Sequence, residues 1–264
     1  MTTFDGAPGF RAGFGALFKG IGFVFTTPRI WPYAAVPALI LISMASVLVW
    51  IAVSWVAPAV EGWLGEPASW YGQIGVTLAT VLSAILVGGL GVLLALALTP
   101  PLSGPALERI VAEKERQLGV PPREPHSFLS EMWCGLRAQL FAASFAVPLL
   151  IALWIVDLLL PPAAVITIPL KFLVAAFALA WNLFDYPLTL RGMRMRRRYR
   201  LLTSYKRATL GFGTAFALLF FVPCFGVLML PVGVAAATEL IWRMLRANPE
   251  LAGEPASPAA GAQL

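Results

Sequence analysis

The charged side chains that interrupt long apolar stretches of this sequence are its first candidates for chemistry. Asp157 and Lys171 lie within such stretches, Asp185 and Glu239 lie at the ends of others, and Arg29 precedes the first. A charge deep in an apolar environment needs a partner, a route to water or a function. We therefore expect Asp157 to face water near a turn and Lys171 to reach an interface. Asp185 and Glu239 are expected to cap a helix or to pair with nearby arginines.

Arg29 is placed to meet an anion, because it lies at the start of the first long apolar stretch. Backbone N–H groups at proline-broken helix starts also attract anions through the helix dipole. The alternative for Arg29 is a contact with a lipid headgroup or a part in fixing the orientation of the chain in a membrane. The residues themselves leave both interpretations open.

The sequence contains no catalytic set and no spacing typical of metal ligands. His126 is the single histidine and lies in a proline-rich linker, while Cys134 and Cys224 lie in different kinds of segment. The glycines at 211–216 lack both the spacing and the preceding strand of a dinucleotide-binding turn. We therefore predict that the protein is not an enzyme and that it needs neither a cofactor nor a metal.

The composition indicates an integral membrane protein. Only 12% of the 264 residues are charged and 59% are hydrophobic, and the mean hydropathy is +0.81. Soluble domains carry about 25% charged residues. The net charge of +6 would suggest a nucleic-acid partner in a soluble protein. Most of the excess lies in one block beside an apolar run, which the positive-inside rule explains, so no nucleic-acid partner is expected.

Two uncharged stretches are long enough to cross a bilayer, which takes about 20 apolar residues. The first covers 30–60, and we place its span near 36–58. The second covers 67–107, with a predicted helical core at 72–98 that ends before two prolines. The sequence therefore predicts two long transmembrane helices.

Two later regions, 138–184 and 208–240, predict helical hairpins broken by proline and glycine. The apolar segments of the first are each about 20 residues long, which fits a transmembrane pair or a shallower hairpin. The second region has no charge over 208–238 and is too long for one span. We predict two helical pieces folded back at a turn marked by Pro223, Gly226 and Pro231.

The segment 191–207 is strongly basic and contains no acidic residue. Such a block stays in the cytoplasm and can contact anionic headgroups of the lipid bilayer. Five lysines and arginines at 108–137, against none at 61–70, place that loop and the N-terminus in the cytoplasm as well. The residues predicted to contact headgroups are Arg194, Arg196, Arg197, Arg198 and Arg200.

The remaining segments complete a single predicted membrane domain at 1–245. Residues 8–29 show helical spacing that suits either a helix on the membrane surface or an ordinary packed helix. Residues 106–119 predict a polar helix with interleaved charges. The tail 246–264 is rich in Ala, Pro and Gly and is predicted to be disordered.

Three segments together resemble one membrane-protein family. They are PPLSGPALERIVAEKERQLG at 100–119, FDYPLTLRGMR followed by LGFG at 184–213, and VPCFGVLMLPVGVAAATELIW at 222–242. PRIWPYAAVPAL at 28–39 fits the same pattern. Their order and spacing resemble the bacterial CysZ sulfate permeases and the related etoposide-induced-protein (autophagy-associated) membrane family, over roughly 10–243.

The resemblance implies an all-α protein of the bacterial inner membrane with two long transmembrane helices and two hairpins that insert only in part. It also implies a homo-oligomer that acts as a permease for a small inorganic oxyanion, with sulfate as the candidate. The alternative is a non-transporting scaffold or lipid-interacting protein of the same fold. No catalytic residue is implied.

The resemblance also implies site residues, with one departure from the family pattern. CysZ permeases carry a Gly-x-Arg-Arg loop before the first long helix, whose arginines bind sulfate. Here Trp31-Pro32 replaces the two arginines, and Arg29 falls where the glycine would be. Glu108 matches the carboxylate of a Pro-x-x-Gly-x-x-x-Glu segment, and Asp185 begins an Asp-Tyr-Pro motif. Arg29, Glu108 and Asp185 are therefore the expected substrate-binding residues.

Overall fold

The described part of the chain, in a computed structural model, is helical and contains no strand. It covers residues 7–65, 69–122, 128–219, 225–248 and 250. Four helical segments within it are long and apolar enough to cross a membrane, namely Pro28–Leu64, Trp70–Leu102, Gln139–Leu159 and Pro161–Leu190. The prediction of an all-α integral membrane protein is confirmed.

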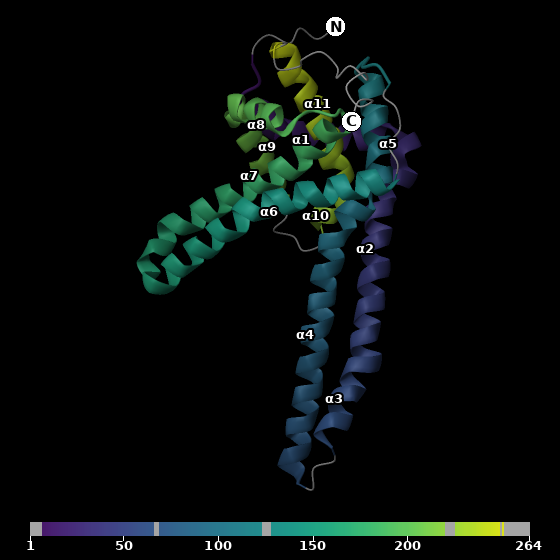
Figure 1. Ribbon diagram of the computed structural model, residues 1–264, viewed down its shortest axis with the longest axis vertical. Coiled ribbons are helices and arrows are strands. Elements are labelled where there is room, and N and C mark those ends of the chain that lie inside the picture. The colour runs from purple at the N-terminus through teal and green to yellow at the C-terminus, as the bar shows by residue number, and fades with distance from the viewer. Residues whose placement is uncertain (1–6, 66–68, 123–127, 220–224, 249, 251–264) are drawn as a thin grey trace, which may run out of the picture.

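The first two spans form one long antiparallel hairpin that projects from the rest of the molecule (Figure 1). Its first arm joins η1 (Pro28–Ile30), α2 (Trp31–Ile51), the π-helical turn η2 (Ala52–Val56) and α3 (Ala57–Leu64). Its second arm is α4 (Trp70–Leu102). The predicted spans at 36–58 and 72–98 lie inside these arms. At about 1.5 Å per residue, each arm exceeds the thickness of a hydrocarbon core of about 30 Å.

Small side chains bring the two arms together. Gly88 faces Ala52, to whose Cβ an added methyl group would lie 3.7 Å away. A Cβ added to Gly91 would lie only 2.8 Å from the Cβ of Leu48. Membrane helices associate through such small residues because lipid provides no hydrophobic force between them. The outer faces of both arms carry exposed Leu, Ile and Val side chains, as lipid-facing helices do.

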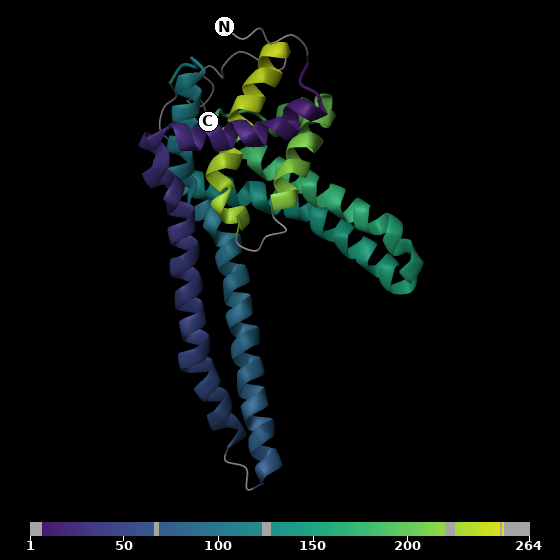
Figure 2. The same cartoon turned by 180° about the vertical axis from the view of Figure 1, so that it is seen from behind.

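The second hairpin joins α6 (Phe128–Leu159), the short turn η3 (Pro161–Ala163) and α7 (Ala164–Leu190). Both helices are longer than the predicted pieces of about 20 residues, because polar residues extend each helix beyond its apolar part. In both views this hairpin leaves the body of the molecule at a wide angle to α2 and α4 (Figures 1 and 2). If α2 and α4 cross a bilayer at right angles, α6 and α7 therefore enter it obliquely.

The remaining helices form a compact head at one end of α2 and α4. They are α1 (Phe10–Thr26), α5 (Gly104–Gln117), α8 (Met195–Ser204), α9 (Lys206–Leu219), α10 (Phe225–Leu228) and α11 (Leu230–Ala247). α11 is the centre of the core, with thirteen of its residues buried. Figure 2 shows α1 lying across the head, over α9 and α11. α1 is a packed helix, although Phe10, Phe18 and Phe25 remain exposed on its outer side.

The predicted break between the two halves of 208–240 is present. α9 and α11 are separate helices with the single turn α10 between them, and neither is among the candidate spans of the described chain. Gly226 is buried in α10 and Pro231 lies in the first turn of α11. Pro223 lies outside the described residues, as does most of the tail 246–264; α11 itself continues to Ala247.

Candidate functional site

α5 directly follows the second arm of the long hairpin and makes polar contacts with α7, with α11 and with Thr27 before η1. It begins after Ser103, whose hydroxyl donates a hydrogen bond to the Thr99 carbonyl at 2.6 Å. The Tyr186 hydroxyl of α7 donates to the Gly104 carbonyl. One face of α5 is buried through Leu107 and Ile110. Lys114, in the last turns of α5, is buried as well and contacts both α1 and α11.

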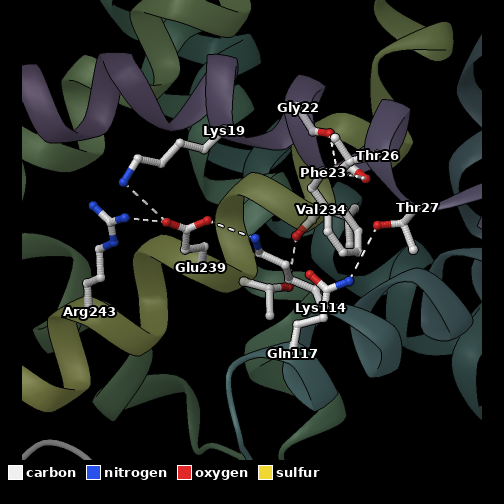
Figure 3. Close-up of polar contacts among 11 residues, drawn as sticks. Lys19, Gly22, Phe23, Thr26, Thr27, Lys114, Gln117, Val234, Glu239 and Arg243 are labelled. Carbon is white, nitrogen blue, oxygen red and sulfur yellow. Dashed lines mark hydrogen bonds and ion pairs between the residues drawn. The ribbon is translucent and has the colours of Figure 1, made fainter. Parts of the chain in front are cut away.

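A single carboxylate, Glu239 of α11, receives three cationic side chains at this junction (Figure 3). Lys114 Nζ lies 2.8 Å from Glu239 Oε2, and Lys19 Nζ lies 3.4 Å from Oε1. Arg243, one turn further along α11, pairs with the same Oε1. The Glu239 side chain is 13% exposed and the Lys114 side chain 9%. The cluster therefore links three helices through a nearly buried carboxylate.

Aromatic and amide groups hold the cluster in place. The ammonium of Lys114 lies over the Phe23 ring, 4.7 Å from its centroid, which is a favourable cation–π arrangement. Gln117 Nε2 donates to Thr27 Oγ1 at 3.4 Å, close to the start of the first span. Figure 3 shows both contacts on the same side of Glu239. Because Phe23 is buried, it also excludes water from one side of Lys114.

An ion pair, a cation–π contact and a hydrogen bond fix the C-terminal end of α5. Arg191 Nε lies 2.9 Å from Glu115 Oε1, and the guanidinium stacks on Trp242 at 5.2 Å. Arg246 Nη2 donates to the Leu118 carbonyl at 2.9 Å. Cations near a helix C-terminus stabilise its free carbonyl groups and its dipole. The last turn of α5 is thus held both to the end of α7 and to α11.

The three residues implied by the family resemblance lie on three different elements. Arg29 is exposed in η1, Glu108 is half-buried in α5, and Asp185 is buried in α7. Arg29 is near enough to Glu113 that its charge helps to lower the pKa of that carboxyl, behind the larger effect of the hydrogen bond from Arg116. Arg29 therefore lies beside the polar end of α5.

Asp185 is engaged within the fold. Arg198 Nη1 lies 2.8 Å from Asp185 Oδ1, and the Thr189 hydroxyl donates to Oδ2 at 3.2 Å. Arg198 also donates to the Met193 carbonyl at 2.6 Å. The expected pairing of Asp185 and Glu239 with nearby arginines is thus present in both cases. For Asp185 the partner comes from the basic block.

The basic block consequently divides into two kinds of side chain. Arg194, Arg196 and Arg200 are exposed on or beside α8, whereas Arg197 and Arg198 are half-buried. Leu201 and Leu202 anchor the helix to the core. The exposed arginines remain predicted contacts for anionic headgroups, and Arg198 serves the internal pair.

Asp157 and Lys171 are partners, which the sequence analysis did not predict. Lys171 Nζ pairs with Asp157 Oδ2, and the Thr167 hydroxyl donates to Oδ1, across the α6–α7 turn. The Asp157 side chain is 20% exposed and the Lys171 side chain is 25% exposed. In an apolar hairpin, two opposite charges that pair with each other cost less free energy than two charges that are buried separately. The ion pair neutralises both charges, while the contacts of Asp157 with water and of Lys171 with an interface stay predictions.

The sequence predicted an arginine partner for Glu239, which is Arg243, but not the two lysines, Lys19 and Lys114. Lys19 and Lys114 lie far from Glu239 in the sequence, within segments whose charges are ordinary for exposed helix faces. The one local signal is the four-residue spacing from Glu239 to Arg243, which places both on the same helix face.

The Glu239 cluster makes stability depend on pH in a predictable direction. Burial raises the pKa of Glu239, but Lys114 and the charges of Arg243 and Lys19 outweigh it, so the pKa lies below the ordinary 4.5. The carboxylate then stabilises the fold fully above that ordinary value, and the contribution is lost as pH falls through the lower, folded-state pKa. We expect the Tm of purified protein to fall below about pH 4.5, and to fall less steeply in Glu239→Gln. An equal fall in both proteins would contradict this prediction.

A comparison with curated proteins found no match. A family model described as Sulfate transporter CysZ/Etoposide-induced protein 2.4 matches residues 16–231, well over half of the chain. The matched region begins within α1 and ends in the first turn of α11, so it includes both long hairpins. The earlier resemblance is confirmed: this multi-pass membrane protein belongs to the CysZ/etoposide-induced protein 2.4 family.

Proposed function

We propose that the protein is an inner-membrane permease for a small inorganic oxyanion, with sulfate as the first candidate. The observation that carries this proposal is a group of cationic side chains in the head, together with Arg29 at the start of the first span. Lys19, Lys114 and Arg243 surround one carboxylate, and Arg29 is exposed in η1. Cation-rich sites next to a membrane span raise the local concentration of anions. The family match supports the same class of substrate.

The proposed orientation places the N-terminus, the head and the basic helix α8 in the cytoplasm. Lysines and arginines concentrate in the head, while the tip between α3 and α4 carries none over 61–65 and 69–70. The apolar outer faces of both hairpins are available to lipid and to further copies of the chain. We propose a homo-oligomer in which copies meet through these faces.

The test is uptake of labelled sulfate into proteoliposomes, compared with empty liposomes. We expect uptake that excess unlabelled sulfate abolishes. In Arg29→Ala we expect a loss of roughly tenfold, because one charged hydrogen bond is worth about 1.5–3 kcal/mol. Arg11→Ala is the matched control, since Arg11 is an exposed arginine of the preceding helix. An equal loss in both variants would argue against a role for Arg29 beyond general electrostatics.

A non-transporting scaffold or lipid-interacting protein is the second candidate. It is favoured by the replacement of the family's arginine pair by Trp31-Pro32 and by the exposed Arg194, Arg196 and Arg200. Folded protein that gives no uptake of sulfate would support this candidate over the permease.

A further inference from the structure

Three cationic side chains share the single carboxylate of Glu239. Two nearby carboxylates of α5 pair with other residues, Glu113 with Arg116 and Glu115 with Arg191. Carboxylate, sulfate and phosphate oxygens are all recognised by the same cationic donors. Another oxyanion can therefore compete with Glu239 for these donors.

The carboxylate of Glu239 is held as an oxyanion ligand would be held. Both of its oxygens are used, Oε2 by Lys114 and Oε1 by Lys19 and Arg243. The donors come from α1, α5 and α11, so they converge on one point from three directions (Figure 3). Lys114 is the fixed member, because it is nearly buried and lies over the Phe23 ring.

Lys19 is the residue at which an anion from solution can compete with the Glu239 carboxylate. Its side chain is 48% exposed, and its 3.4 Å contact with Oε1 is longer than an ordinary charged hydrogen bond of about 2.7–2.9 Å. An anion that approaches from water therefore meets Lys19 first. The geometry of a three-cation cradle suits a sulfate or phosphate group, whose several oxygens can be shared among the donors.

We propose that Lys19, Lys114 and Arg243 form a binding site for a sulfate- or phosphate-type oxyanion, and that Glu239 occupies this site as an internal competitor. A bound oxyanion takes the place of the Glu239 carboxylate on Lys19 and Arg243. This proposal gives the proposed permease a defined anion site in its head, and in that respect it rests on the proposed function. The same chemistry is available from a free inorganic anion and from the phosphate of a lipid headgroup.

Displacement of Glu239 would also loosen the contact between helices. The carboxylate joins α11 to α1 and α5, and its displacement from Lys19 and Arg243 leaves the anion as the link between α1 and α11. Occupancy of the site is thereby coupled to the position of α1, which leads directly through η1 into the first span. Glu239 thus couples anion binding to the start of α2.

The experiment measures the thermal stability of purified protein as inorganic sulfate or phosphate is added at constant ionic strength, with chloride as the balancing salt. Sulfate stabilises proteins in general, so the informative quantity is the difference between variants. We expect Lys19→Gln to raise the apparent Kd for sulfate about tenfold or more, because it removes one charged donor. Arg11→Gln, which changes an exposed cation on the same helix, should match the wild type.

Glu239→Gln gives the opposite expectation. Without the Glu239 carboxylate, the apparent Kd for sulfate should fall about tenfold. The three cations are then no longer occupied by Glu239, so a larger fraction of the protein can bind the anion. Lys19→Gln keeps the test decisive if Glu239→Gln fails to fold, because Lys19 is half-exposed. The same stabilisation by sulfate and phosphate in wild type and Lys19→Gln, in detergent and in bilayers, would overturn the proposal.

A second arm distinguishes the source of the anion. The same variants are compared in nanodiscs of phosphatidylglycerol and of phosphatidylcholine, without added sulfate or phosphate. A stabilisation by phosphatidylglycerol that Lys19→Gln removes, without any effect of free sulfate or phosphate, would assign the site to a lipid phosphate. Binding of sulfate without flux in proteoliposomes would refute the permease and retain the site. Flux in wild type with unchanged binding in Lys19→Gln would retain the permease and refute the site.

Discussion

Alanine at Gly13 or Gly211 is expected to disrupt the head of the molecule. α1 and α9 cross so closely that a Cβ on Gly13 would overlap the Ala208 carbonyl, and one on Gly211 would overlap the Phe10 carbonyl. Both neighbours are backbone atoms of packed helices and cannot rotate away. Overpacking usually costs about 1–3 kcal/mol and can cost more. We expect at least about 3 kcal/mol for either change, measured by reversible unfolding in detergent micelles.

Gly15 and Gly22 provide matched controls on the same helix. An added Cβ at either position meets nothing within 4 Å. Alanine is favoured over glycine inside a helix by about 1 kcal/mol, so Gly15→Ala and Gly22→Ala should be neutral or stabilising. Equal destabilisation by Gly13→Ala and Gly15→Ala would mean that α1 does not approach α9 as the structure shows.

These glycines also illustrate what could be read from the sequence. The frequent glycines of 8–29 weaken a helix by propensity alone, yet α1 forms as a helix. Close packing requires glycine at Gly13 and Gly20. A Cβ added to Gly20 would lie 2.5 Å from the carbonyl oxygen of Val232. Tertiary packing therefore overrides the local preference. Such contacts depend on helices distant in sequence, and no local pattern reveals them.

The long spans were predictable because burial in lipid acts on each residue independently. Absence of charge over 30–60 and 67–107 was sufficient to locate α2 and α4. The Asp157–Lys171 pair and the Glu239 cluster were not predictable, since a pairing depends on which helices meet. In the sequence each of these side chains has several possible partners. Only the crossing of α1, α5 and α11 selects Lys19 and Lys114 for Glu239.

Arg198→Ala is expected to be the most damaging change within the basic block. Asp185 is 3% exposed, and its pair with Arg198 joins α7 to α8 at 2.8 Å. Removing one partner of a buried pair leaves the other charge uncompensated, at a cost of about 3–5 kcal/mol. Arg198 also donates to the Met193 carbonyl, so alanine would remove a contact that holds the turn before α8. Unfolding of purified protein measures the loss.

The exposed arginines of the same block separate this structural role from a role in substrate or lipid binding. Arg194→Ala and Arg200→Ala should change the free energy of unfolding by no more than about 0.5 kcal/mol, because surface substitutions rarely do more. Arg198→Lys should recover only part of the stability, since a single ammonium cannot reproduce the contacts of a guanidinium to Asp185 and to the Met193 carbonyl. If Arg198→Ala instead left stability unchanged and abolished sulfate uptake, Asp185 and Arg198 would belong to the substrate site. A loss of stability with normal uptake per folded molecule would assign the pair to the fold and leave substrate binding to Arg29 and the Glu239 cluster.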